Sequence, residues 1–407
     1  MPSIAILSGN HLCHNPRVIK EATALQAAGY EVEVFGGWFD PVLKARDLDL
    51  MANLKFRFHP LLDLMERPAL RLGLRVRGRI AKFFHARTGC ENHWQFGYFA
   101  PSLERIARYT KADLLIAHSE PALWALSRLS PLQAKLGVDM EDWFSVDLPP
   151  ETQKNRPIKL LRRMEQDLLR RAAHTTCTSK AMSDALVSEY GCSPPAVVYN
   201  AFPWADRQTL DGKFKDRQNV VLPSIHWYSQ TIGMDRGLDD LLAALPLLKY
   251  ECEIHLRGKP VAGFNEWLLA RLPEPWRKRI FIHPLVSGDE LLSRIAEHDI
   301  GFAGEQKFIR NKDVTVSNKI LHYLLAGLAV VASDTAGQCE IAEQASGAVR
   351  TYSSGDSQAL AKELNRLLAS AGELRSAKAA ALMAAEQTFC WERQVPVLLS
   401  NIKKALS

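Results

Sequence analysis

Short apolar runs alternate with amphipathic stretches along this chain, and the alternation occurs twice. In the first half, the runs predicted as strands are Ile4–Leu7, Glu31–Phe35, Asp113–Ala117, Lys135–Asp139 and Thr175–Thr178. In the second half they are Val220–Leu222, Cys252–Leu256, Ile280–His283, Ile300–Ala303 and Ala329–Ser333. Strands separated by helical segments predict parallel, doubly wound sheets. We therefore expect an α/β chain with two successive Rossmann-like domains facing one cleft.

Capping signals predict where the helices begin. Asn15 is a suitable N-cap, Pro16 suits the first helical position, and Gly29 closes a helix predicted over Pro16–Ala28. The other expected helices are Leu238–Leu248, Asp289–Glu297, Ser317–Ala326, Ser357–Leu368 and Trp391 to about Leu406. The polar, proline-containing segment that ends at Arg217 is predicted as an interdomain linker. We expect domains at 1–205 and 206–388, followed by a terminal helix at 389–407.

Composition excludes several classes of protein. The first ten residues lack the basic and apolar regions of a signal peptide, and no apolar run is long enough to cross a membrane. The seven cysteines are scattered and never spaced as CxxC, which argues against a zinc site and a disulfide framework. We expect a cytoplasmic protein. The net charge of +6 is too small to indicate nucleic-acid binding by itself.

The first candidate site is the loop after the first strand, SGNHLCHNPRVIKEA, with Gly9, Asn10 and Arg17. A glycine after a buried strand permits close approach of a ligand, and the following helix start suits an anion. An ordinary strand–helix turn is the alternative, and this segment alone favours it. No GxGxxG motif occurs here, so a dinucleotide site is poorly supported.

Two polar clusters follow the ends of predicted strands, where cleft residues of such sheets lie. His118, in AHSEPAL, could donate a hydrogen bond to a sugar hydroxyl or a phosphate, or could cap the next helix. Asp139, Glu141 and Asp142, in VDMEDW, could orient an acceptor hydroxyl. Loop and N-cap carboxylates are the commoner use of such residues.

Two helix starts in the second half carry cations. Arg236 precedes Gly237 at a predicted helix start, where a guanidinium can hydrogen-bond two oxygens of a diphosphate. In the segment SNKILHYLLAGLAVVASD, Ser317 is a candidate N-cap, and Asn318 and Lys319 lie in the first turn. A lysine in a first turn is electrostatically unfavourable unless an anion is bound there, so this motif is the more specific of the two.

Together these segments resemble the retaining, GT-B-fold glycosyltransferases of family 4 and its relatives. The likeness also covers TSKAMSDALVSEYG followed by VVYNAFP, and FIHPLVSGDELLSRIAEHDIGFA, so it extends along almost the whole chain. It implies a donor bound mainly by the C-terminal domain, an acceptor bound mainly by the N-terminal one, and a terminal helix that crosses back to the first domain. His118 corresponds to a histidine close to the transferred sugar, and Arg236 and Lys319 correspond to groups at the donor diphosphate.

The chain departs from the family pattern where the donor ribose binds. The family usually has two glutamates there; here the second position is His322, the first falls at Val314, and Glu305 is a candidate substitute. The common Gly-Arg of the second domain is Ser229-Gln230. The residues expected to bind the donor are Gly9, Asn10, Ser229, Gln230, Arg236, Glu305, Ser317, Asn318, Lys319 and His322. The expected acceptor residues are Arg17, Glu141 and Asp142, and the expected catalytic residues are His118, Arg236 and Lys319.

The resemblance implies transfer from a nucleoside-diphosphate sugar with retention, by front-face attack in which the departing diphosphate helps to deprotonate the acceptor. Catalysis would then depend on positioning and on neutralising the leaving group. We expect no metal and no cofactor, since no DxD-like pair stands out in a suitable loop. The alternatives are a catalytically weak or inactive scaffold subunit, which His322 keeps open, and a sugar-nucleotide epimerase or phosphorylase-like enzyme, whose signatures are not evident.

Residues 67–87 form the strongest charge pattern in the chain. Seven cations alternate with large apolar residues, and no acid follows Glu66 in this stretch. A basic amphipathic segment of this kind can bind an anionic membrane surface, although a solvated helix face is the ordinary alternative. We expect peripheral binding to the inner face of the membrane, where a lipid-linked, polysaccharide or glycolipid acceptor lies.

Overall fold

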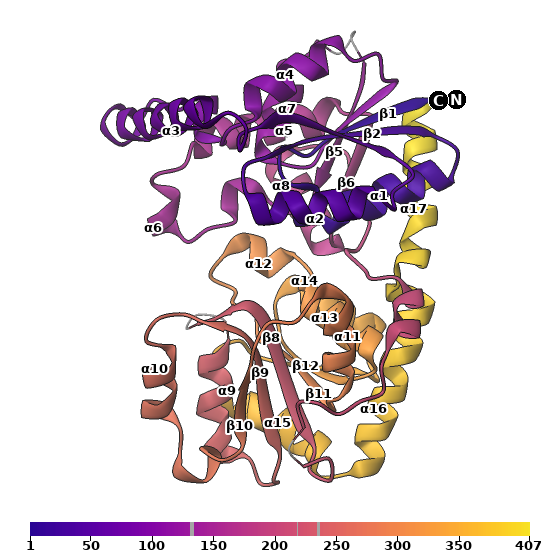
Figure 1. The fold of residues 1–407 in the computed structure, drawn as a ribbon. Helices are drawn as coiled ribbons and strands as arrows, with labels where there is room; N and C mark the ends of the chain where they lie inside the picture. Colours follow the sequence, from indigo (N-terminus) through magenta and orange to yellow (C-terminus); the bar gives the residue numbers. More distant parts are fainter. Residues whose placement is uncertain (131–133, 218, 234–236) are drawn as a thin grey trace. The chain divides into compact units, whose positions relative to one another are not determined.

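The computed structural model describes residues 1–130, 134–217, 219–233 and 237–407, and the chain divides into two compact units. Unit 1 comprises Met1–Thr178, Met182–Val198 and Val395–Ser407. Unit 2 comprises Ser179–Ala181 and Tyr199–Gln394. Each unit is a parallel sheet with helices on both faces (Figure 1). The end of the chain belongs to unit 1, as expected for a terminal helix that returns to the first domain.

Unit 1 contains a parallel sheet for which the described residues give the strand order β3-β2-β1-β4-β5-β6-β7. Its strands are β1 Ser3–Leu7, β2 Glu31–Trp38, β3 Arg57–Asp63, β4 Leu114–Ala117, β5 Lys135–Met140, β6 His174–Cys177 and β7 Ala196–Val197. Its helices are α1 Pro16–Ala27, α2 Pro41–Met51, α3 Pro68–Thr88, α4 Ala100–Tyr109, α5 Glu120–Ser127, α6 Pro150–Gln153, α7 Ile158–Arg171 and most of α8 Lys180–Tyr190. Short 3-10 turns are η1 Leu12–His14, η2 His93–Gln95 and η3 Phe144–Val146.

Unit 2 repeats this plan, with the strand order β10-β9-β8-β11-β12-β13 among its described residues. The strands are β8 Ser224–Ile232, β9 Glu253–Pro260, β10 Ile280–His283, β11 Ile300–Ala303, β12 Ala329–Ser333 and β13 Val349–Tyr352. The helices are α9 Leu238–Ala244, α10 Phe264–Arg271, α11 Gly288–Ala296, α12 Arg310–Val314, α13 Asn318–Ala326, α14 Ala336–Gln344, α15 Ser357–Leu368, α16 Ala371–Ala384 and α17 Trp391–Leu406, whose last part lies in unit 1. Shorter turns are η4 Trp204–Thr209, η5 Leu245–Leu247, η6 Glu274–Trp276 and the π-turn η7 Ala385–Phe389.

The local signals that predict helix starts act as expected. The Asn15 side chain accepts a hydrogen bond from the Val18 amide at 3.1 Å, and Pro16 is the first residue of α1. The Ser317 side chain accepts from the Lys319 amide at 3.4 Å at the start of α13. Together with the two parallel sheets, these helices confirm the α/β fold class with two Rossmann-like domains.

One predicted strand is wrong. Val220–Leu222 is not a strand: Val221 is 86% exposed, and the strand is Ser224–Ile232 instead. The true strand pairs with β9 and β11 along its two edges. Its first four residues are buried, yet they include polar Ser224 and His226. Ser229 and Gln230, two of the expected donor-binding residues, lie on this strand.

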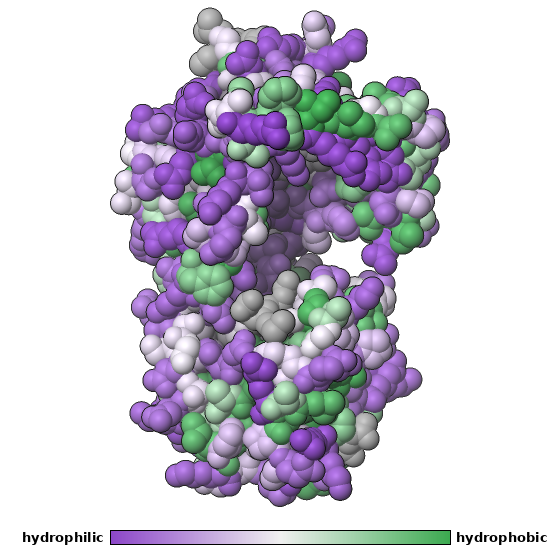
Figure 2. Space-filling model, turned by 90° about the vertical axis from the view of Figure 1, so that its left-hand side faces the viewer, coloured by the Kyte–Doolittle hydropathy of each residue, from purple (hydrophilic) through white to green (hydrophobic). Residues whose placement is uncertain are grey.

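Helix α3 projects from unit 1 (Figure 1). Figure 2 shows the molecule from the side where α3 lies, with strongly hydrophobic and strongly hydrophilic side chains next to one another. Among the described helices, including this one, none is both long enough and apolar enough to cross a membrane.

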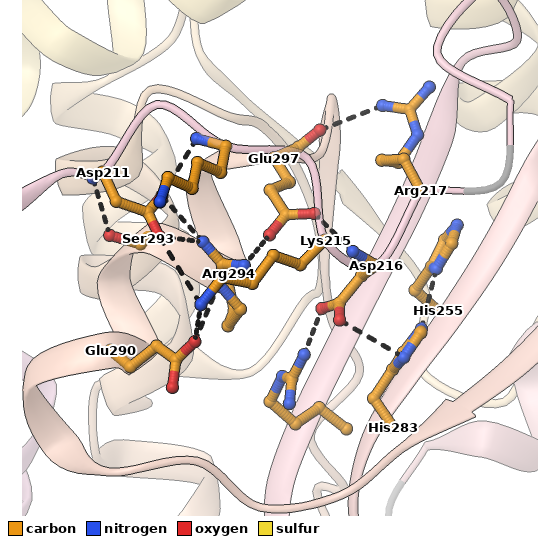
Figure 3. A network of polar contacts seen from close by, with 12 residues as sticks. Asp211, Lys215, Asp216, Arg217, His255, His283, Glu290, Ser293, Arg294 and Glu297 are labelled. Atoms are coloured by element: carbon orange, nitrogen blue, oxygen red, sulfur yellow. Dashed lines mark hydrogen bonds and ion pairs between the residues drawn. The ribbon is translucent and has the colours of Figure 1, made fainter.

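The segment 211–217, predicted as an interdomain linker, belongs to unit 2 and is bound to it by ion pairs (Figure 3). Arg294 of α11 is 1% exposed and contacts Asp211 at 2.6 Å and Glu297 at 2.7 Å. The Glu297 carboxylate also accepts a hydrogen bond from the Asp216 amide at 2.7 Å. These contacts hold the segment against α11.

Candidate functional site

The loop after β1 in unit 1 is closely packed. Gly9 has a φ of +66°, and a Cβ there would lie 2.8 Å from Pro121, so the position requires glycine. Asn10 accepts the His11 amide through its side chain at 2.8 Å and the Gly37 amide through its carbonyl at 3.1 Å. Both candidate donor residues therefore shape the loop, and their contact with a donor stays a prediction.

A buried ionic cluster joins α1 to the ends of β4 and β5 in unit 1. The His118 Nε2 atom lies 2.7 Å from a Glu21 carboxylate oxygen, and the exposed fractions of these side chains are 0% and 2%. One turn earlier on α1, Arg17 donates to both oxygens of Asp139 at 2.9 and 3.0 Å and to the Val198 carbonyl at 2.8 Å. His118 and Arg17, both predicted site residues, therefore lie in one cluster.

The cluster balances its charges. Burial alone would lower the pKa of His118, but the carboxylates of Glu21 and Asp139 raise it to about 9. Against the cost of burial, Arg17 keeps the pKa of Asp139 below its usual value. A protonated His118 and Arg17 thus face two carboxylates, and the four groups carry no net charge.

The same geometry bears on metal binding. Among the described residues, Glu21, His118 and Asp139 each offer one ligand atom within 4.8 Å of the others. Arg17 already occupies both oxygens of Asp139, and its positive charge opposes a cation there. We interpret the cluster as two ion pairs, and the expected absence of a metal stays a prediction.

The acceptor candidates differ in their surroundings. Arg17 is only 3% exposed and engaged in the cluster. Glu141 and Asp142 are half-buried, and Glu141 accepts a hydrogen bond from Asn15 Nδ2 at 3.3 Å. Burial raises the pKa of Glu141 to about 7, where a carboxylate can accept a proton from a hydroxyl group near neutral pH. Of these three, Glu141 has the chemistry best suited to an acceptor.

In unit 2, the start of α13 carries a lysine–glutamate pair. Lys319 Nζ lies 2.6 Å from a Glu305 carboxylate oxygen, which also accepts from Ser317 Oγ at 3.0 Å. Burial alone would raise the pKa of Glu305, but the Lys319 ammonium lowers it to about 2. Both side chains are 16% exposed, so the pair is accessible from solvent. The Glu305 carboxylate is thus an anion, supplied by the chain itself, that offsets the lysine at this helix start.

Hydrogen bonds to Ser333 of β12 fix the loop that carries Glu305. Ser333, fully buried at the end of β12, accepts the Glu305 amide at 2.8 Å and donates to the Glu305 carbonyl at 2.7 Å. Gln338 donates to Ser333 Oγ at 2.9 Å. Gly237 has a φ of +77°, and a Cβ there would lie 1.9 Å from the Gly304 carbonyl oxygen. Glu305 is thus held by contacts that leave its backbone little freedom.

His322 is one turn further along α13 and lies among aromatic side chains. Its ring stacks on Phe202 with centroids 3.4 Å apart, and its Nδ1 atom is 2.6 Å from the Tyr228 hydroxyl. Burial raises the pKa of Tyr228, so this hydroxyl stays protonated and forms a neutral hydrogen bond with Nδ1. His322 therefore differs from a glutamate in shape and in hydrogen bonding, because it is oriented by two aromatic residues.

The remaining predicted donor residues are spread along unit 2. Asn318 is exposed and accepts from Asn200 Nδ2 at 3.1 Å, and Gln230 is also exposed. Ser229 is half-buried, and Val314 is buried. Arg236 lies outside the described residues, so its role stays a prediction. Unit 2 brings Glu305, Ser317 and Lys319 together, with His322 one turn away.

Sequence reasoning missed Glu21, Tyr228, Phe202 and Ser333. Glu21 follows Arg17 by four residues and so shares its face of α1, which is a signal that the spacing contains. Phe202 and Tyr228 contact His322 from distant parts of the chain, and no local pattern indicates this.

Comparison with protein families gives two matches. Residues 17–203 match the model described as Glycosyltransferase Family 4, and residues 225–370 match the model described as Glycosyl transferases group 1. No curated protein sequence matches the chain.

Solved structures of similar fold cover the whole chain. HepE of Anabaena in complex with UDP is 15% identical with a TM-score of 0.69, over 99% of this chain and 100% of that one. Sucrose-phosphate synthase of Thermosynechococcus elongatus is 14% identical with a TM-score of 0.67, over 99% of both chains. A UDP-forming trehalose-phosphate synthase of Burkholderia xenovorans is 14% identical with a TM-score of 0.67, over 100% of both. At these identities the likeness shows the fold, which is GT-B. Because the two family matches together span most of the chain, the chain belongs to the GT-B glycosyltransferases of family 4 and group 1.

Proposed function

We propose that the protein transfers a sugar from a nucleoside-diphosphate sugar to a lipid-linked, polysaccharide or glycolipid acceptor, with retention and without a metal. The single observation that carries this proposal is the Lys319–Glu305 pair at the start of α13. The matches to Glycosyltransferase Family 4 and to Glycosyl transferases group 1 support sugar transfer as the reaction class. HepE structures with UDP, with UDP and glucose, and with UDP-glucose support a nucleotide-sugar donor.

Lys319 stabilises the leaving diphosphate in this proposal. The helix start offers free amide groups and a positive dipole end, and the ammonium adds a full charge. Glu305 orients Lys319 in the free protein, and the ammonium can contact phosphate while it keeps one bond to the carboxylate, since it has three donors. Arg236 adds a second cation at the diphosphate. Catalysis then consists of positioning and charge neutralisation.

Unit 1 supplies the acceptor side. His118 is the cation expected near the transferred sugar, and Glu141 is the carboxylate suited to an acceptor hydroxyl. We propose that the reaction takes place at the cytoplasmic face of a membrane to which the protein is peripherally bound.

A screen of nucleoside diphosphates and their sugars by thermal shift tests the donor, because a ligand specific for the folded state raises its apparent stability. Donor hydrolysis without acceptor then tests catalysis, and NMR of the anomeric proton of the product tests retention. Activity that persists in a chelator supports metal independence. If no nucleotide stabilises the protein, the proposal is wrong.

A non-catalytic subunit is the second candidate, favoured by His322 in place of the usual glutamate. It predicts nucleotide binding without hydrolysis or transfer. The hydrolysis assay separates it from the enzyme.

We expect Lys319→Ala to weaken binding of a nucleoside diphosphate by about ten- to a hundredfold. A lost hydrogen bond to a charged group costs roughly 1.5–3 kcal/mol, and the substitution leaves the Glu305 carboxylate unneutralised beside the phosphates. Calorimetry measures the affinity. The control is Lys307→Ala, which removes an exposed lysine of the same loop that pairs with Asp334. Unchanged affinity in Lys319→Ala would contradict the donor assignment, and Arg236→Ala is expected to behave like Lys319→Ala.

We expect His322→Ala to weaken binding of a nucleoside diphosphate more than binding of inorganic pyrophosphate. If His322 contacts the ribose, only the ligand that has a ribose loses a contact. Tyr228→Phe removes the hydroxyl that orients the imidazole and is expected to give a smaller loss of the same kind. Equal losses for the two ligands in His322→Ala would show that His322 does not read the ribose.

A further inference from the structure

Helix α3 is joined to unit 1 along one narrow stripe. Leu74, Gly78, Ala81 and His85 recur at intervals of three or four residues and so share one face. Ala81 is buried, and the imidazole of His85 hydrogen-bonds Gln95 Nε2 at 2.9 Å. These contacts with the η2 turn fix the orientation of the helix about its own axis.

The two remaining faces of α3 are exposed, and the first is apolar. Leu72, Val76, Ile80 and Phe83 follow one another at intervals of three or four residues, with Phe84 beside them. Leu72 is 62% exposed, and Phe83 and Phe84 are 51% and 54% exposed. The two phenyl rings meet edge to face with centroids 6.0 Å apart. A stripe of this size is unusual on a water-facing helix.

The second exposed face is basic. Arg71, Arg75, Arg79 and Lys82 each precede a member of the apolar stripe by one residue, which rotates them by about 100° around the helix. Arg75, Arg79 and Lys82 are exposed, and no acid occurs between Glu66 and Glu91. The basic stripe therefore runs beside the apolar stripe along the helix, with no carboxylate of its own to neutralise it.

We propose that α3 docks on an anionic lipid bilayer with its axis parallel to the surface. The apolar stripe enters the boundary between headgroups and acyl chains, and the basic stripe binds the anionic headgroups beside it. The 21-residue helix is about 30 Å long, so a row of headgroups can bind along it.

Charge and shape favour a bilayer over the other occupants. A second copy of α3 would bring two basic stripes together, which like charges oppose. A soluble polyanion would use the basic stripe and leave Phe83 and Phe84 in water. An interface that is apolar on one side and anionic on the other fits both stripes together.

The inference deepens the proposed function by identifying the surface at which the acceptor is met. Docking needs neither donor nor acceptor, so binding of vesicles by the full chain can be measured without any assay of transfer. A failure of docking would leave nucleotide binding and donor hydrolysis intact, whereas a failure of nucleotide binding or of transfer would leave docking intact.

The test is co-sedimentation of the full-length protein with vesicles of phosphatidylcholine alone or mixed with phosphatidylglycerol. We expect binding to the mixed vesicles only, with release as salt rises from about 0.1 M to about 1 M, where the Debye length falls from about 10 Å to about 3 Å. Arg75→Glu with Arg79→Glu and Lys82→Glu should weaken binding at least tenfold. Phe83→Ser with Phe84→Ser should also weaken it at least tenfold, at unchanged charge.

The matched control places the same three charge reversals on unit 2, as Arg271→Glu with Arg277→Glu and Lys278→Glu, all at exposed positions. It should bind like the wild type. Circular dichroism confirms that each variant is folded. Equal binding by the α3 charge variant, or equal binding to both kinds of vesicle, would overturn the proposal. Normal binding by the phenylalanine variant would show a purely electrostatic contact of the kind a polyanion makes, and would overturn insertion.

Discussion

Arg17→Ala is expected to lower the free energy of unfolding of unit 1 by about 3–5 kcal/mol, because breaking a buried ion pair leaves the other charge uncompensated. Arg17 and Asp139 are 3% and 2% exposed, and the guanidinium holds both carboxylate oxygens. The substitution also removes the donor of the Val198 carbonyl. Denaturant unfolding, followed by fluorescence, measures the loss.

Two variants separate charge from packing. Arg17→Met combined with Asp139→Leu removes both charges and is expected to recover most of the loss, since apolar replacements of a buried pair are often neutral. Arg128→Ala, which removes an exposed arginine 4.0 Å from Glu104, should cost less than about 1 kcal/mol. A loss in Arg17→Ala as small as that in Arg128→Ala would show that the buried pair does not stabilise α1 against the sheet.

The fold was predictable because its signals are local. Buried parallel strands such as Ile4–Leu7 and Ala329–Ser333 are mostly continuous apolar runs. Asn15 and Ser317 are N-cap residues that mark the starts of α1 and α13. Strand β8 broke this rule. Its buried Ser224 contacts the His298 ring at 3.1 Å and thereby satisfies a polar group that a local pattern assigns to a loop.

The site was predictable in its positions and not in its pairings. His118 follows β4 and Lys319 lies at the start of α13, as strand ends and caps indicate. That Glu21 holds His118 and Glu305 holds Lys319 depends on which elements the sheets bring together. Glu305 was expected at the ribose, which stays a prediction, and in the structure its carboxylate contacts Lys319.

Unit 2 is expected to lose stability steeply as pH falls below about 6.5, because its core contains neutral histidines. His226, His255 and His298 are fully buried. The His226 and His298 rings stack with centroids 4.5 Å apart, and the His255 ring is tilted by 42° against that of His298 with centroids 4.6 Å apart. Burial, and then the neighbouring arginines and histidines, lower the pKa of all three, that of His255 to about 3.

The direction follows from which state binds protons. In the unfolded chain a histidine titrates near 6.5, whereas these folded histidines stay neutral to lower pH. Below 6.5 the unfolded state gains protons that the folded state does not bind, so each such histidine costs about 1.4 kcal/mol per pH unit. Three of them lower the free energy of unfolding by on the order of 5 kcal/mol between pH 7 and pH 5.

The charged groups around the stack shape this dependence. Arg217 and Arg257 oppose protonation, while Glu253 at 3.2 Å from His255 and Asp216 at 3.4 Å from His283 favour it. His283 shares a 2.9 Å contact with His255, and burial also lowers its pKa. Asp299 accepts a hydrogen bond from Ser224 Oγ at 3.4 Å. Arg257 lies on β9, as His255 does, and Arg217 ends the segment 211–217. The same arginines keep the histidines neutral and form ion pairs of Figure 3, so the neutral histidines and these ion pairs are stabilised together.

His226 allows a direct test, since among the described residues neither of its ring nitrogens has a hydrogen-bond partner. His226→Phe keeps an aromatic ring at this position and removes one titrating group. The free energy of unfolding, measured from pH 7 to pH 5, should therefore fall less steeply, because unfolding takes up about one proton fewer. His14→Gln, at an exposed position, should leave the slope unchanged. If His226→Phe is as acid-sensitive as the wild type between pH 7 and pH 5, the buried histidines are not the cause. Carboxylates such as Glu305 act below that window, because the stability that its lowered pKa contributes is lost as pH falls from about 4.5 to about 2. These two causes act in separate pH ranges, so the position of the fall identifies which groups control the stability of unit 2.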